Sequence, residues 1–135
     1  MLALPGSFMN ESGETVRKLI QHFETDPASD LLVVIDDVSL PFGKLRIRSQ
    51  GSDGGHRGLR SVETHLGSQN YARLRVGIAP SAEIGVPLEE YVLSPFTSQE
   101  EKKLSGFLGE AGEACLLWLT QPMEKVMNKV NKSNS

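Results

Sequence analysis

The sequence is short of the features that mark several classes of protein. Only one of its 135 residues is a cysteine, so the chain cannot form an internal disulfide, as is usual in a reducing compartment. No apolar run reaches the roughly 20 residues that a membrane-spanning helix needs, and no stretch resembles a signal peptide. The net charge is only −3 at pH 7, so the overall charge does not indicate a polyanionic partner. We therefore expect a cytoplasmic globular protein with one domain and no membrane partner.

Positive charge is nevertheless concentrated in one part of the chain. Half of the fourteen basic residues fall between positions 44 and 75: Lys44, Arg46, Arg48, Arg57, Arg60, Arg73 and Arg75. Basic and apolar residues alternate over 44–48, which is typical of a half-buried strand with a positive outer face. Such a strand can bind the phosphates of RNA or of another ligand, and it is equally compatible with a solvated face that binds nothing.

The order of apolar patterns predicts an α/β fold, with a mixed β-sheet flanked by helices in a single layered domain over residues 1–135. Residues 26–30 are expected to form a loop, 40–43 a turn, and 132–135 a disordered tail. Strands are predicted at 1–4, 31–35, 44–49 and 72–78, and helices from about residue 12, from Arg57, at 98–119 and at 123–130.

Two carboxylates directly follow the apolar run LLVVI. Asp36 and Asp37 are expected at the carboxyl end of this buried strand, where open α/β sheets place their ligand sites. A charge at such a position is costly unless it has partners or a chemical task. These two residues are therefore the first candidates for catalysis.

Three segments together resemble the bacterial-type peptidyl-tRNA hydrolase family. PGSFMNESGETV at 5–16 is similar to its Met-Asn motif, VIDDVSLPFGKLRIR at 34–48 to its Asp and Leu-Pro-x-Gly segment, and GSDGGHRGLRSV at 51–62 to its Gly-Gly-His loop. RLRVGI at 73–78, VLSPF at 92–96 and MNKVN at 127–131 match later landmarks of the family in the same order. The resemblance covers essentially the whole chain.

The resemblance implies a fold, an activity and a set of site residues. Members of the family cleave the ester bond between a peptide and the 3′ end of tRNA, which recycles tRNA in translation. They act as monomers without a metal or another cofactor. By position, Asp36 corresponds to the aspartate that holds the catalytic histidine, and Asn10 to the asparagine that places substrate and water. The residues expected to bind the substrate or tRNA are Asn10, Phe8, His56, Arg57, Arg48 and Arg75.

The sequence departs from the family pattern in two places. The family's N-terminal strand and the Thr-Arg-His-Asn segment that carries its general base are not found in the 135 residues. None of His22, His56 and His65 has that sequence context. In addition, Arg57 replaces the loop asparagine, and an arginine cannot accept a hydrogen bond from a water. Arg57 could instead bind phosphate or pair with one of the two aspartates.

Three explanations of the missing segment stay open: a truncated or mis-started sequence, a degenerate relative, or a remodelled site in which His56 is the base. With a missing N-terminus, an organellar location is also compatible. We expect a peptidyl-tRNA hydrolase domain without its N-terminal catalytic part, and impaired hydrolysis by this chain. The alternatives are a non-catalytic RNA-binding relative and a structural remnant without a ligand.

Overall fold

The computed structural model of the protein describes residues 12–79 and 98–133. By contacts the chain divides into two compact units, one of Met1–Val33 with Ser49–Arg73, and one of Val34–Arg48 with Leu74–Ser135. The chain therefore passes between the units after Val33, after Arg48 and after Arg73. Each unit is described by itself.

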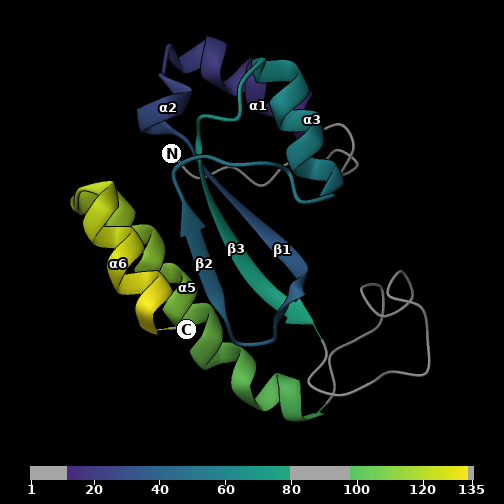
Figure 1. The fold of residues 1–135 in the computed structure, drawn as a ribbon, viewed down its shortest axis with the longest axis vertical. Coiled ribbons are helices and arrows are strands. Elements are labelled where there is room, and N and C mark those ends of the chain that lie inside the picture. The colour runs from purple at the N-terminus through teal and green to yellow at the C-terminus, as the bar shows by residue number, and fades with distance from the viewer. Residues whose placement is uncertain (1–11, 80–97, 134–135) are drawn as a thin grey trace. The chain divides into compact units, whose positions relative to one another are not determined.

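A three-stranded sheet lies mostly in the second unit. Its strands are β1 (Leu32–Pro41), β2 (Leu45–Arg48) and β3 (Ala72–Ala79), in the order β1-β3-β2. β1 and β3 run in the same direction and β2 runs opposite to them, so the sheet is mixed (Figure 1). The predicted α/β class with a mixed sheet is confirmed.

At Gly77, β3 lies close to the backbone at the end of β1. A Cβ atom at this position would overlap the carbonyl oxygen of Pro41, so only glycine fits there. The backbone N–H of Gly77 donates to the Lys44 carbonyl at 2.8 Å, and that of Phe42 donates to the Ala79 carbonyl at 3.1 Å. These bonds connect both sides of the turn at Phe42–Gly43 to the central strand.

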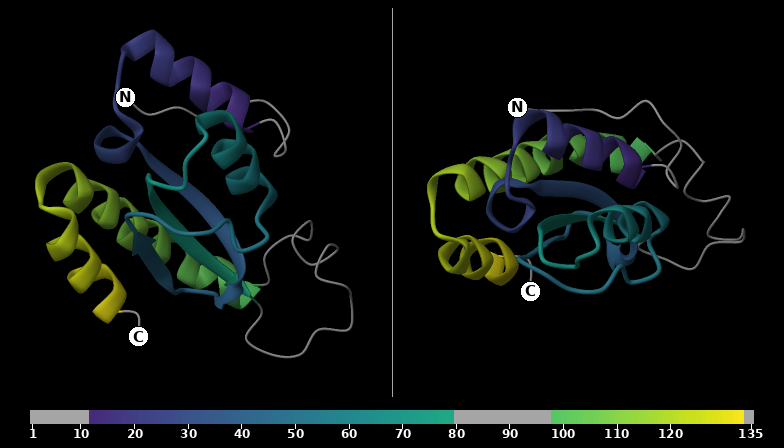
Figure 2. Two further views of the ribbon diagram at one scale, coloured as in Figure 1. Left: turned by 45° about the horizontal axis from the view of Figure 1, so that its top comes forward. Right: turned by 90° about the horizontal axis from the view of Figure 1, so that it is seen from above.

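Two helices complete the described part of the second unit, α5 (Ser98–Thr120) and α6 (Met123–Ser133). α6 packs against β2 and α5, as Figure 2 also shows. Leu45 and Ile47 of β2 are buried, whereas Arg46 and Arg48 are exposed, as the alternating pattern predicts. The buried side chains of this unit also include Leu74, Phe107, Ala114, Val126 and Val130.

The first unit holds α1 (Ser12–Phe23), α2 (Pro27–Asp30) and α3 (Arg57–Leu66). α1 packs closely against α3 because Gly13 has no side chain, and its N–H donates to the buried Ser61 Oγ at 2.9 Å. The helix at Arg57 begins where the sequence predicts, and it ends at Leu66; the following Gly67, with a φ of 68°, forms a left-handed C-terminal cap.

Several sequence predictions differ from the structure. Residues 26–30 are not only a loop: Asp26 caps the short helix α2, and Pro27 fits its first turn because the missing N–H has no partner to lose there. α6 reaches Ser133, three residues beyond the predicted end at Val130, so the predicted tail begins within a helix. The strand predicted at 1–4 lies outside the described residues. In the described ranges, no helix is long and apolar enough to cross a membrane.

The largest difference concerns β1, which continues to Pro41 rather than ending at Ile35. Asp36 and Asp37 therefore lie inside the strand, and the prediction that they stand at its carboxyl end was wrong. The strand continues because its neighbour β3 pairs alongside it as far as Phe42 and Ala79. Inside the strand, the charge of Asp37 is stabilised by hydrogen bonds from Ser39 and by an ion pair with Arg75.

Candidate functional site

Asp37 and Arg75 form an ion pair between the two neighbouring strands β1 and β3. Arg75 Nη1 lies 3.4 Å from Asp37 Oδ2, and the two side chains are only 14% and 12% exposed. The backbone N–H and the hydroxyl of Ser39 donate to Asp37 Oδ1 at 2.8 and 2.6 Å. This carboxylate is therefore held by three donors on the surface of the sheet.

The pKa of Asp37 lies below its ordinary value. Burial acts to raise it, but the two hydrogen bonds from Ser39 and the positive charge of Arg75 together outweigh that effect. Asp37 therefore remains a carboxylate at neutral pH, and it is a partner for Arg75 rather than an acid ready to donate a proton.

Asp36 is half-buried and occupies the position just before Asp37 on the same strand. Because successive side chains of a strand point to opposite faces of the sheet, Asp36 and Asp37 do not share a face. The adjacent aspartates, expected together as candidates for catalysis, are thus separated. Asp36 lies on the face opposite the Asp37–Arg75 pair.

The glycine-rich loop at 51–56 is shaped by its own hydrogen bonds. Asp53 Oδ1 accepts from the Gly55 N–H at 2.8 Å, and the Asp53 carbonyl accepts from the His56 N–H at 3.0 Å. Gly54 and Gly55 adopt φ values of 60° and 85°, which favour glycine. His56 closes the loop as the N-cap of α3, with Nδ1 accepting from the Leu59 N–H at 3.3 Å.

Arg73 fixes this loop through hydrogen bonds to its backbone carbonyls, a role that the sequence did not predict. Its side chain is 1% exposed. Nη1 donates to the carbonyls of Gly51 (2.8 Å) and Ser52 (3.2 Å), and Nη2 donates to the Gln69 carbonyl (2.8 Å). The guanidinium also lies over the ring of Tyr71, 4.2 Å from its centre. The pattern RLR at 73–75 contains no signal that separates this buried arginine from an exposed one.

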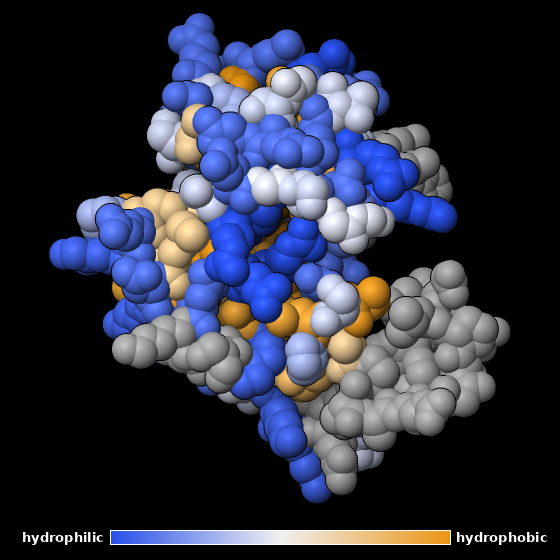
Figure 3. Space-filling model, in the orientation of Figure 1, coloured by the Kyte–Doolittle hydropathy of each residue, from blue (hydrophilic) through white to orange (hydrophobic). Residues whose placement is uncertain are grey.

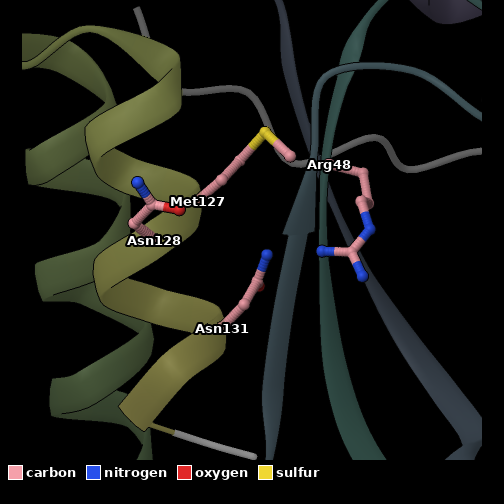
Figure 4. Close-up of a pocket in the computed structure, with 4 residues that line it drawn as sticks. All are labelled: Arg48, Met127, Asn128 and Asn131. Atoms are coloured by element: carbon pink, nitrogen blue, oxygen red, sulfur yellow. The ribbon is translucent and has the colours of Figure 1, made fainter.

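The basic residues differ in how accessible they are. Arg46, Arg48 and Arg57 are exposed, whereas Arg75 is largely covered and paired. Figure 3 shows hydrophilic side chains over β2, in accord with its exposed arginines. Arg48 also lines an open pocket between β2 and α6 together with Met127, Asn128 and Asn131 (Figure 4).

All three histidines lie in the first unit. His56 caps α3, His65 Nδ1 lies 2.9 Å from the Ser61 carbonyl oxygen, and the exposed His22 contacts the Phe23 ring edge-on at 4.7 Å. Among the described residues, no group of three or more histidine, cysteine or acidic side chains could hold a metal ion. Phe8 and Asn10 lie outside these residues.

Comparisons with known proteins identify the family to which the chain is similar. The family model for peptidyl-tRNA hydrolase matches residues 1–135. The peptidyl-tRNA hydrolase of Herpetosiphon aurantiacus is 45% identical over 130 residues, covering 96% of this chain and 63% of the relative. That of Bacillus cereus (strain Q1) is 40% identical over 131 residues, covering 97% and 69%.

Solved structures lead to the same family. The crystal structure of peptidyl-tRNA hydrolase from Acinetobacter baumannii matches with a TM-score of 0.81 at 28% identity, covering 95% of this chain and 64% of that one. This chain thus spans about two thirds of the length of the proteins it matches. Since sequence and fold agree along essentially all of its residues, the chain belongs to the peptidyl-tRNA hydrolase family.

Proposed function

We propose that this chain takes part in hydrolysis of the ester bond between a peptide and tRNA, and that the 135 residues by themselves catalyse it slowly. The observation that carries the proposal is the family match, which extends over residues 1–135. The non-catalytic RNA-binding alternative is not favoured, because the matched relatives are named as hydrolases.

In this proposal, Asp36 orients a histidine base and stabilises its protonated form. A half-buried carboxylate suits this task, because partial removal from water strengthens its interaction with an imidazolium. The neighbouring Asp37 does not compete for the role, since Arg75 and Ser39 already occupy it. Asn10 and Phe8 are proposed to contact the substrate.

Slow catalysis by the chain alone is supported by the positions of its histidines. His56 uses Nδ1 to cap α3, and His65 uses Nδ1 in a contact with Ser61. These interactions fit structural roles in the first unit. A general base typically contributes about 10²- to 10⁴-fold to a rate, so its loss would leave weak turnover.

The tRNA phosphates are proposed to bind the exposed Arg48 and Arg57, with Arg75 as a weaker candidate. Arg75 would have to exchange the Asp37 carboxylate for a phosphate, at the cost of a largely buried ion pair. Arg48 carries no such cost, because its side chain is exposed on the outer face of β2. Contacts of this kind supply affinity rather than sequence preference.

Peptide release from diacetyl-lysyl-tRNA tests the proposal. We expect the 135-residue chain to turn over at least about 100-fold more slowly than the Bacillus cereus (strain Q1) relative. A rate close to that of the relative would contradict slow catalysis. In that case Asp36→Ala should abolish the turnover if Asp36 orients the base, whereas Glu110→Ala, on the exposed surface of α5, should leave it unchanged. Undiminished turnover by Asp36→Ala would then contradict the role of Asp36.

A further inference from the structure

Asn131 of α6 binds the backbone of strand β2. Its Oδ1 accepts from the Ile47 N–H at 2.8 Å, and its Nδ2 donates to the Ile47 carbonyl at 3.0 Å. Within residues 12–79 and 98–133, β2 pairs with a strand on one side only, because β3 lies between it and β1. A side-chain amide has the same donor and acceptor as a peptide group, so Asn131 pairs with the Ile47 peptide in the way that a neighbouring strand would.

The Ile47 peptide group also forms a hydrogen bond with the Arg48 side chain. Arg48 Nη1 donates to the Ile47 carbonyl at 3.2 Å, so this oxygen accepts from both Arg48 and Asn131. A carbonyl oxygen has two lone pairs and can accept both bonds. In Figure 4 the two side chains come from β2 and α6 and lie on either side of the open pocket.

We propose that Asn131 is a positioning residue for RNA binding. Asn131 fixes the position of the Ile47 carbonyl oxygen, which accepts a hydrogen bond from the Arg48 guanidinium. In this way it orients that guanidinium toward a phosphate of the RNA backbone. A fixed guanidinium loses less conformational freedom when it binds than a mobile one does. This inference rests on the proposed function, from which it takes Arg48 as a phosphate contact.

A purely structural role for Asn131 predicts a different result. If the amide only stabilises the packing of α6 on β2, its removal lowers the free energy of unfolding but leaves the affinity of the folded protein unchanged. If it positions Arg48, its removal weakens RNA binding, and only while Arg48 is present. A double-mutant cycle separates the two roles.

The cycle uses the full 135-residue chain and unacylated tRNA, with affinities measured at several salt concentrations. We expect Arg48→Ala to weaken binding about tenfold and to reduce the salt slope by about one. Asn131→Ala should weaken binding about three- to tenfold in the original chain and by less than about 1.5-fold in the Arg48→Ala background. Asn128→Ala is the matched control: it lies in the same helix and lines the same pocket, and it should bind tRNA like the original chain.

Asn131→Asp keeps the proposal testable if Asn131→Ala folds poorly. The introduced carboxylate retains the acceptor for the Ile47 N–H but lies against the Ile47 carbonyl and attracts the Arg48 guanidinium. We expect it to weaken tRNA binding at least as much as Asn131→Ala does.

Three outcomes would overturn the inference: unchanged tRNA affinity for the Asn131 variants, equal losses in both Arg48 backgrounds, or no effect of Arg48→Ala. The last result would remove the Arg48 phosphate contact as well. The hydrolytic proposal is judged independently by peptide release, so loss of this inference alone leaves that assay unchanged.

Discussion

The sequence makes Asp37 a candidate for catalysis, and the structure shows it as an ion-paired, hydrogen-bonded carboxylate. Two charges beside a buried strand indicate a functional site, but Asp37 has the partners of a structural group in Ser39 and Arg75. Asp36, one position earlier, points to the other face of the sheet and has a different environment. The assignment of roles therefore depends on which side of a strand each residue occupies, which two adjacent letters of sequence do not reveal.

Asp37→Asn should change the pH dependence of stability. Because folding lowers the pKa of Asp37, its stabilising effect is present above the unfolded value of about 3.9 and is lost as pH falls through the lower folded value. At neutral pH the variant should lose about 1 kcal/mol of unfolding free energy, since an amide oxygen still accepts from Ser39 but no longer pairs with Arg75.

The measurement is urea unfolding at several pH values between 2 and 7. Below about pH 4 the original chain should lose stability more steeply than Asp37→Asn. Glu110→Gln removes an equal charge from an exposed position and should leave the slope unchanged. Parallel curves for the original chain and Asp37→Asn would contradict the lowered pKa.

At the scale of secondary-structure elements, the sequence predicted the helices and strands that depend on local residue patterns. β2 was predicted because its alternation of basic and apolar residues matches a half-buried strand, and α3 because Leu59 and Val62 recur at helical spacing; both residues are buried. β1 was predicted too short because its last residues are held by pairing with β3, a contact distant in sequence. The short helix α2 depends on one capping bond from Asp26 and has too few residues for a periodic signal.

The packing of α1 on α3 depends on the absence of a side chain at Gly13. A Cβ atom there would overlap the backbone carbonyl of Ser61, which cannot move without shifting α3. We expect Gly13→Ala to lower the unfolding free energy by about 1–3 kcal/mol, the usual cost of overpacking, despite the better helix propensity of alanine.

Gly112→Ala is the matched control for this prediction. Gly112 also lies inside a helix, α5, but a Cβ atom there would meet nothing within 4 Å. This variant should gain about 0.5–1 kcal/mol from helix propensity alone. Thermal or urea unfolding measures both changes, and equal effects of the two substitutions would show that helix packing at Gly13 is not the cause.

At the scale of the whole molecule, the residues of interest are divided between the two units. Asp36, Arg48 and Arg75 belong to the second unit, and His56 and Arg57 to the first. The sequence motifs located all of these residues. The motifs at 73–78 and 127–131 also contain Arg73 and Asn131, but they assigned no role to either residue. Both bind backbone carbonyl groups, and every residue has a carbonyl group whatever its type, so the sequence does not reveal such a contact.

Arg73 links the end of α3, the glycine-rich loop and the start of β3 inside the first unit. Arg73→Met removes its bonds to the carbonyls of Gly51, Ser52 and Gln69, and it leaves the largely covered Glu63 carboxylate without the cation 3.9 Å away. Breaking a buried pair in this way should cost about 2–4 kcal/mol of unfolding free energy. Arg46→Met, at an exposed position of β2, should cost less than about 0.5 kcal/mol.

Hydrogen exchange shows how far that loss extends. Since Gly51, Ser52, Gln69 and Glu63 lie within the first unit, backbone amides of 49–73 should lose protection at least about tenfold in Arg73→Met, while those of α5 and α6 lose less. The chain crosses between the units three times, which couples the unfolding of one unit to that of the other. This coupling reduces the difference in lost protection between the two units. An equal loss of protection in both units would mean that this coupling exceeds the local contribution of Arg73, and that the two units unfold together.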